Sequence, residues 1–122
     1  VIDDQLTIGI DPGTRIGISV IYLHIEIASM LESSPMGTVG QVATRLAGIS
    51  THKKVVRIGD GDITMARQMA WALKKRFGDN IRVEIVDEYG TSQTADANRR
   101  GVRDRFSART IAFRTGRVFT HY

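Results

Sequence analysis

Acidic side chains follow three separate apolar runs in this chain of 122 residues. Asp11 follows the first run, Asp60 the second, and the pair Asp87 and Glu88 the third. If these runs are parallel strands, their carboxyl ends meet at one edge of a sheet, where ligands bind in α/β proteins. Clustered carboxylates repel one another unless a cation neutralises them. Because the chain has no cysteine and no histidine pair, the donor set favours Mg²⁺ or Mn²⁺ over Zn²⁺.

The first run alternates large and small side chains. Branched aliphatic residues form one face of a predicted strand over 6–10, whereas the other face carries only Thr7 and Gly9. The strand ends at Asp11-Pro12-Gly13, which is typical of a turn. Two interpretations stay open. Either the small residues leave room beside Asp11 for a metal ion or a phosphate, or Asp11 only opens the turn.

Alternation along the third run separates its two acids. Asp87 and Glu88 continue opposite faces of the strand, so both cannot point inward unless the strand has already ended. A further acid, Asp104, lies in the first turn of a helix predicted over 104–115, where small residues allow close packing on the sheet. Asp104 either reaches the strand ends or only caps its helix, and the pattern favours neither.

Positive charge is concentrated in the last quarter of the chain. Residues 1–89 carry ten Lys or Arg and eleven Asp or Glu, whereas residues 90–122 carry seven Arg and two Asp. Arginine binds phosphate in a bidentate manner, so this segment predicts a polyanion-binding surface. The alternative is a solvated helix surface. The seven residues are Arg99, Arg100, Arg103, Arg105, Arg109, Arg114 and Arg117.

The length and composition are those of a globular domain without a membrane helix. The length and the 42% hydrophobic content predict a single domain over 1–122 with a core of its own. No apolar run is long enough for a membrane helix, and Asp3 and Asp4 argue against a signal peptide. The absence of cysteine fits a cytoplasmic protein. We expect the histidines to be surface or structural residues, since His24, His52 and His121 have no metal-ligand spacing.

The hydrophobic periodicity predicts an α/β fold with the element order β-β-β-α-β-α-β-α-α. The first three strands should form an antiparallel meander, and strands joined by helices should be parallel. Strands are predicted over 6–10, 16–22, 25–31, 55–58 and 81–86, and helices over 38–51, 63–77, 91–100 and 104–115. We expect Trp71 to pack under the first helix, although an exposed Trp71 would be a candidate for a dimer face.

Three motifs resemble one family of nucleases. I-G-I-D-P-G-T-R-I-G-I-S-V (8–20) resembles the first strand and hairpin of RuvC-like nucleases of the RNase H fold. V-D-E-Y-G-T-S-Q-T-A (86–95) resembles the D-E-R-x-T-[TS] motif of the YqgF (RuvX) branch. D-R-F-S-A-R-T-I-A (104–112) resembles the final helix of that branch. The motifs occur in the right order and extend over the chain from end to end.

The resemblance implies an RNase H-like, five-stranded mixed sheet with helices on both faces. It also implies a Mg²⁺- or Mn²⁺-dependent nuclease that resolves Holliday junctions or processes pre-ribosomal RNA. The catalytic and metal-ligating acids carried over are Asp11, Glu88 and Asp104. The chain departs from the branch at Tyr89, where Arg is usual, and at 58–62, where G-L-P is usual. That second departure makes Asp60 an extra candidate ligand, and Asp87 is a further candidate.

The expected reaction is hydrolysis of a phosphodiester in branched DNA or structured RNA. Thr14 and Arg15, next to Asp11, are expected to contact the scissile phosphate. Thr91 and Ser92 are expected to do the same through hydroxyls or helix-start amides. The backbone of the nucleic acid would be held by Arg99, Arg100, Arg103, Arg105 and Arg109.

Two other classes of protein remain open. A module with a degenerate site would use the same arginines to bind nucleic acid or a protein. Actin-like kinases and ATPases share the phosphate turn D-x-G-T-x-x-G, which residues 11–17 match, but they hold nucleotide between two domains. A junction resolvase would also need two sites related by two-fold symmetry, and therefore a homodimer.

Overall fold

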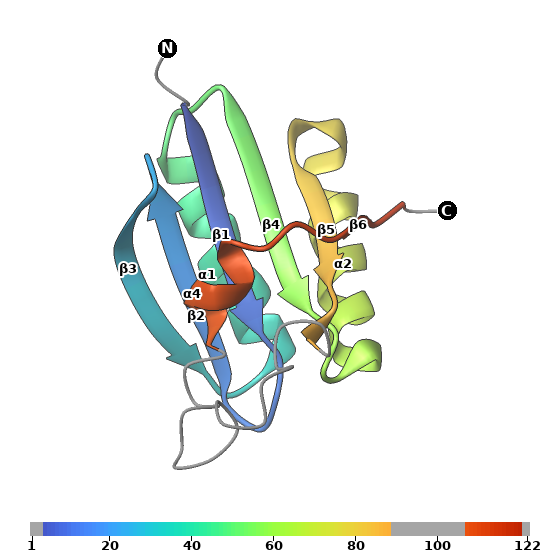
Figure 1. The fold of residues 1–122 in the computed structure, drawn as a ribbon. Coiled ribbons are helices and arrows are strands. Elements are labelled where there is room, and N and C mark those ends of the chain that lie inside the picture. The colour runs from blue at the N-terminus through green and yellow to red at the C-terminus, as the bar shows by residue number, and fades with distance from the viewer. Residues whose placement is uncertain (1–3, 89–106, 121–122) are drawn as a thin grey trace.

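A mixed six-stranded sheet forms the centre of the computed structural model, which describes residues 4–88 and 107–120 (Figure 1). The strand order is β3-β2-β1-β4-β5-β6. β1 pairs antiparallel with β2 and parallel with β4, while β5 is parallel to β4 and antiparallel to β6. The strands are β1 (Gln5–Asp11), β2 (Ile16–Tyr22), β3 (Ile25–Glu32), β4 (Lys53–Gly59), β5 (Arg82–Val86) and β6 (Arg117–Val118).

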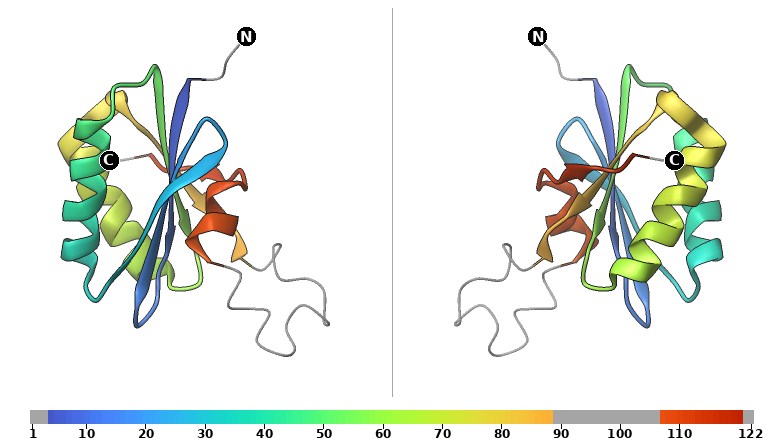
Figure 2. Two further views of the ribbon diagram at one scale, coloured as in Figure 1. Left: turned by 90° about the vertical axis from the view of Figure 1, so that its left-hand side faces the viewer. Right: turned by 90° about the vertical axis from the view of Figure 1, so that its right-hand side faces the viewer.

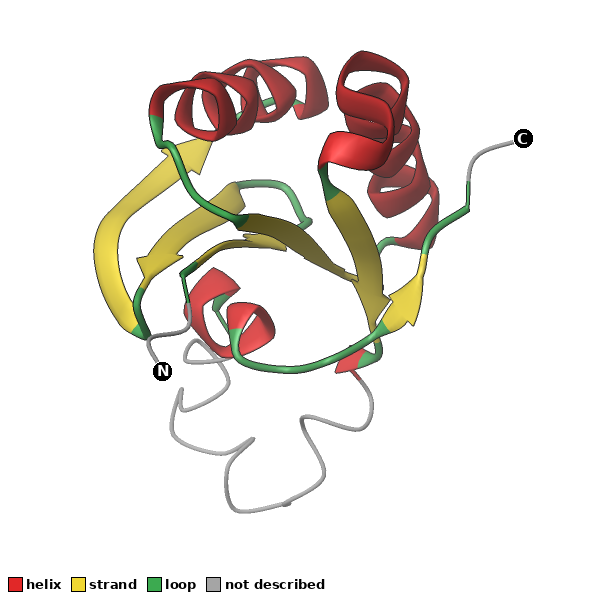
Figure 3. Cartoon of the chain, turned by 90° about the horizontal axis from the view of Figure 1, so that it is seen from above, coloured by secondary structure: helices red, strands yellow, loops and turns green. Residues whose placement is uncertain are grey.

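Helices cover both faces of the sheet (Figures 2 and 3). α1 (Pro35–Gly48) and α2 (Ile63–Phe77) lie on one face, and the short α4 (Ala108–Ala112) lies on the other, against β1 and β2. A 3-10 turn, η1 (Gly78–Asn80), follows α2. Within the described residues, the structure is therefore an α/β fold with a mixed sheet between two layers of helix.

The face of the sheet toward α1 and α2 is the hydrophobic core. The large residues of β1 are fully buried there, as the alternation in the first run predicts. Each buried Leu, Ile or Met contributes roughly 1.5–3 kcal/mol relative to an exposed one. The core cluster includes Leu6, Ile8, Ile10, Val42, Leu46, Val56, Ile58, Met69, Leu73 and Val83.

The opposite face of β1 is covered by α4 at very short range. A Cβ built on Gly9 would lie 2.8 Å from the Cβ of Ala112 and would overlap the carbonyl oxygen of Ala108. Ala108, Ile111 and Ala112 are all buried in this contact. The small residues of β1 therefore serve as the seat of α4, and the sequence-based expectation that they leave open space beside Asp11 is wrong at Gly9.

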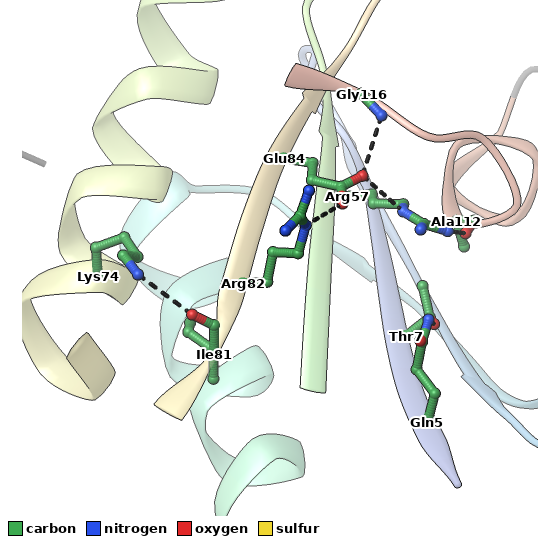
Figure 4. Close-up of polar contacts among 9 residues, drawn as sticks. All are labelled: Gln5, Thr7, Arg57, Lys74, Ile81, Arg82, Glu84, Ala112 and Gly116. Carbon is green, nitrogen blue, oxygen red and sulfur yellow. Dashed lines mark hydrogen bonds and ion pairs between the residues drawn. The ribbon is translucent and has the colours of Figure 1, made fainter. Parts of the chain in front are cut away.

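A buried ion pair fixes α4 and the segment after it to the sheet (Figure 4). The Arg57 guanidinium donates to Glu84 Oε1 at 3.0 Å and to the Ala112 carbonyl at 2.7 Å. The backbone N–H of Gly116 also donates to Glu84 Oε1, at 3.0 Å. The Glu84 side chain is only 4% exposed, so this network holds the C-terminal end of α4 in place from β4 and β5.

The predicted meander and the parallel pairing of β1, β4 and β5 are confirmed. The predicted strand count is wrong, because residues 117–118 add a sixth strand at the edge of β5. α2 has its predicted bounds: Asp62 accepts from the N–H of Met65 at 3.0 Å, and Gly78 ends the helix with φ +58°.

Two predicted helices have different bounds. The first covers 35–48 rather than 38–51: it begins at Pro35, since Ser34 caps it and proline suits a first helical turn, and it ends at Gly48, because Ile49 is extended. The last ends at Ala112 rather than Thr115, because the N–H groups of Phe113 and Arg114 turn back onto Thr110 and Ile111. The helix predicted over 91–100 and the start of the one over 104–115 lie outside the described residues. Among those described, no helix is long and apolar enough to cross a membrane.

Candidate functional site

Asp11 and Glu88 form a pair of interacting carboxylates at the carboxyl ends of the parallel strands. Asp11 is the last residue of β1, and Glu88 lies two residues beyond the end of β5. Burial, and to a smaller extent the negative charge of Glu88, together raise the pKa of Asp11 from 3.8 to about 6. Burial also raises the pKa of Glu88. The structure therefore brings together two of the three acids expected to bind metal.

The Glu88 carboxylate lies above the end of β4, which separates β5 from β1. A Cβ built on Gly59 would overlap Glu88 Oε2, and one built on Gly61 would lie 2.8 Å from it. The N–H of Gly61 donates to that oxygen at 2.8 Å, which partly offsets the rise in the pKa of Glu88. Two glycines thus form a cradle that holds the carboxylate on the Asp11 side of β5.

Asp60 lies in the same cradle and orients the chain at Glu88. Its Oδ1 accepts a hydrogen bond from the backbone N–H of Glu88 at 2.9 Å, and its own N–H donates to the carbonyl of Val86 at 3.0 Å. Its charge also raises the pKa of Glu88. Asp60 therefore acts on the Glu88 segment directly.

Asp87 lies elsewhere. It is exposed, and together with Asp60 it lines a surface hollow of about 450 Å³ that Arg117 also borders. β5 ends at Val86, before both acids, so strand alternation does not decide their directions; Asp87 is exposed, whereas Glu88 is partly buried. Asp60 therefore contacts the Glu88 backbone and also lines the hollow.

The N-terminal end of α4 lies close to Asp11. A Cβ on Gly17, which pairs with Asp11 across β1 and β2, would lie 3.7 Å from the Cβ of Ala108 and 3.8 Å from that of Asp11. The residues just before α4, Asp104 among them, lie outside the described residues. Close packing of the last helix on the sheet, which the small residues predicted, is confirmed for Ala108 and Ala112.

Only some of the other residues predicted to bind nucleic acid lie in the part of the chain that the structure describes. Thr14 and Arg15 are exposed in the turn between β1 and β2, directly after Asp11. Arg109 is exposed on α4, with its guanidinium 5.8 Å from the ring centre of Phe113. His24 and His52 are exposed, as expected. Outside the described residues lie Thr91, Ser92, Arg99, Arg100, Arg103, Asp104, Arg105 and His121.

Sequence reasoning missed the glycine cradle. In the sequence analysis, 58–62 is treated only as a departure from a family pattern, and its acidic residues are considered but not its glycines. A Gly-x-Gly directly after a buried strand is a signal of close approach by another group, and here that group is the Glu88 carboxylate. Sequence reasoning also missed the Arg57–Glu84 pair, because the sequence does not show which residue of the neighbouring strand lies opposite Arg57.

Within residues 4–88 and 107–120, no three acidic or histidine side chains come together as a metal-binding group. The described site thus consists of the Asp11–Glu88 pair. No model of a known protein family matches the chain, and a search of curated proteins finds no match in sequence.

Proposed function

We propose that this protein is a metal-dependent phosphodiester hydrolase acting on structured nucleic acid, with an RNase H-like fold of the RuvC/YqgF type. The observation that carries the proposal is the Asp11–Glu88 pair. Asp11 ends β1, and the glycines at 59 and 61 hold the Glu88 carboxylate beyond the end of β5. Burial together with the charge of Glu88 raises the pKa of Asp11 to about 6. Such a pair has no evident structural role, since it opposes folding when both acids are ionised.

The architecture supports the proposal. The chain order β-β-β-α-β-α-β of residues 5–86, the mixed sheet and the helices on both faces agree with what the resemblance implies. The sixth strand is an addition at the far edge of β5, away from Asp11. The three motifs of the resemblance also contain Asp11, Glu88 and Asp104.

The donor set fits a hard divalent cation. Asp11 and Glu88 offer carboxylate oxygens, which Mg²⁺ and Mn²⁺ prefer, and the histidines at 24 and 52 are not part of this pair. In this proposal Asp11 and Glu88 hold the ion, with Asp104 as the third ligand. When bound, such an ion stabilises charge on the phosphate and lowers the pKa of a water.

Other residues of the chain would orient the metal ligands and bind the phosphates of the substrate. The N–H of Gly61 keeps Glu88 Oε2 in place, and the Asp60 carboxylate fixes the backbone of Glu88. Thr14 and Arg15 would meet the scissile phosphate from the turn after Asp11. The phosphate backbone would be held, with little reading of sequence, by Arg99, Arg100, Arg103, Arg105 and Arg109, which suits branched DNA or structured RNA.

The test is cleavage of a labelled four-way junction, duplex DNA, single-stranded RNA and a structured RNA in Mg²⁺, Mn²⁺ or EDTA. We expect the wild-type protein to cut one of these substrates only with a divalent cation. Asp11→Asn and Glu88→Gln should lose cleavage by at least a hundredfold and keep binding. Asp79→Asn, in the exposed η1, is the matched control and should cut at the wild-type rate.

Two results would contradict the proposal. One is cleavage by Asp11→Asn at the wild-type rate. The other is nucleic-acid binding with no cleavage in either metal, which would favour the module with a degenerate site. Paired symmetric nicks in the junction would further indicate a homodimer.

A further inference from the structure

A second surface feature lies at the β6 edge of the sheet, between α2 and the segment that contains β6. It is a groove of about 430 Å³ lined on one side by residues of α2 and on the other by the segment 117–120. The α2 residues, Ile63, Arg67 and Trp71, are spaced four apart and so lie on one stripe of the helix. Nothing in the proposed reaction uses this groove.

The chemistry of the groove is aromatic and cationic. Trp71 is 44% exposed, which contradicts the expectation that it packs under the first helix. Arg67 and Arg117 are also exposed, and none of the described residues lining the groove is acidic. Lys75 is one turn further along the stripe, with its Nζ 4.8 Å from the ring centre of Trp71. An exposed indole with a lysine beside it and two arginines lining the same groove suits a ligand that combines flat rings with negative charge.

The groove adjoins the hollow at the acidic end of the sheet. Ile85 and Arg117 line both this groove and the hollow that contains Asp60 and Asp87. Ile63, at the near end of the stripe, follows Asp62 directly in the chain. A chain-like ligand that passes over Arg117 would contact residues of both hollows.

We propose that this groove binds single-stranded nucleic acid, with a base stacked on Trp71 and phosphates held by Arg67 and Arg117. Free nucleotides and inorganic phosphate share part of this chemistry but cannot extend along both hollows. The inference rests on the proposed function, because it makes the groove the path of a strand that leaves or enters the candidate active site.

Intrinsic fluorescence gives a direct test, since Trp71 is the only tryptophan in the chain. The full chain is titrated with a ten-residue oligothymidylate in EDTA, so that no cleavage is needed. Saturable quenching that weakens as salt is raised is the expected result. No change in fluorescence, or an equal change with inorganic phosphate, would overturn the inference.

Variants separate stacking from charge. By anisotropy of a labelled oligothymidylate, Trp71→Ala should weaken binding about tenfold or more, and Trp71→Phe should recover part of that loss. Arg67→Ala or Arg117→Ala should weaken binding severalfold and reduce the salt slope by about one. Arg76→Ala, on the same helix but outside the groove, is the matched control, with a change below about twofold. Wild-type affinity in Trp71→Ala, with unchanged circular dichroism, would refute the inference.

The failures of the two proposals are distinguishable. If Asp11-dependent cleavage occurs but oligothymidylate does not quench Trp71, the groove inference is wrong and the nuclease stands. If Trp71 is quenched but no substrate is cut, the groove binds nucleic acid and the proposed hydrolase is wrong. If the Trp71 fluorescence of the protein without oligonucleotide changes with protein concentration, and the molecular mass in solution is that of a dimer, the surface is a homodimer interface. The groove inference is then overturned.

Discussion

The carboxylate of Glu88 occupies the space that a side chain at Gly59 would fill. Gly59 ends β4, the strand between those that carry Asp11 and Glu88, so any side chain there would stand between the two acids. The absence of a single Cβ therefore permits the interaction on which the candidate site depends. Gly61 completes the arrangement with a hydrogen bond to the same carboxylate.

Gly59→Ala should disable the site and leave the fold intact. The new methyl group would overlap Glu88 Oε2 and would lie 2.7 Å from Ile111 Cδ1. Both atoms are at the ends of flexible side chains, which can move aside. We expect cleavage to fall at least tenfold, as for other misplaced catalytic groups, while the melting temperature changes by only a few degrees. Gly40→Ala, with open space around it in α1, is the control and should keep full activity. Full activity in Gly59→Ala would show that the position of Glu88 does not matter.

Gly9→Ala should affect the fold itself. Its methyl group would overlap backbone atoms of α4, which cannot move without lifting the helix from the sheet. Denaturant unfolding should show a loss of about 2–4 kcal/mol, in the range of other overpacked cores. In contrast, Gly40→Ala should gain about 0.5–1 kcal/mol from its higher helix propensity. Equal stabilities for the two variants would contradict the close packing described for α4.

Glu84 should be the most sensitive ionic residue in the described part of the protein. Glu84→Ala would leave the Arg57 guanidinium largely buried with the Ala112 carbonyl as its remaining partner, at a cost of about 3–5 kcal/mol. Arg82→Ala removes a partner that is 56% exposed and should cost less than about 1 kcal/mol. Comparable losses in the two variants, measured by urea unfolding, would argue against the network in Figure 4.

The raised pKa of Asp11 predicts a specific pH dependence in metal-free protein. Below 3.8 Asp11 is protonated in both folded and unfolded states, whereas above about 6 its charge is disfavoured only in the folded state. The wild-type protein should therefore lose stability through Asp11 as the pH rises across this range, on the order of 1 kcal/mol after solvent screening. Asp11→Asn should be the more stable protein at pH 8 in EDTA and should match the wild type near pH 3.5. The same difference at both pH values would contradict the assignment.

The sequence predicts the layers of the fold because burial follows local periodicity. The alternation of 6–10 and the stripe of 63–77 depend on neighbours in the chain, and both match β1 and α2. β6 could not be predicted in this way. It is two residues long, and its hydrogen bonds come from the edge of β5, not from any pattern of its own.

Only part of the candidate site can be predicted from the sequence. The acids at the strand ends identify Asp11 and Glu88, since parallel strands bring their carboxyl ends together. The glycine cradle and the exposure of Trp71 depend on distances between segments far apart in the chain. A pattern along the chain cannot supply those distances, and so Trp71 was expected in the core.

The most direct test of the account is whether Asp11 and Glu88 hold one divalent cation together. The melting temperature of the wild type, Asp11→Asn, Glu88→Gln and the double variant would be measured at pH 8 with EDTA or Mn²⁺. At one hundred times the dissociation constant, bound Mn²⁺ should stabilise the wild type by about 2.7 kcal/mol. Each single variant should lose most of that shift, and the double variant should lose no more than either, because one site is removed in all three. An equal Mn²⁺ shift in all four proteins would contradict the central claim.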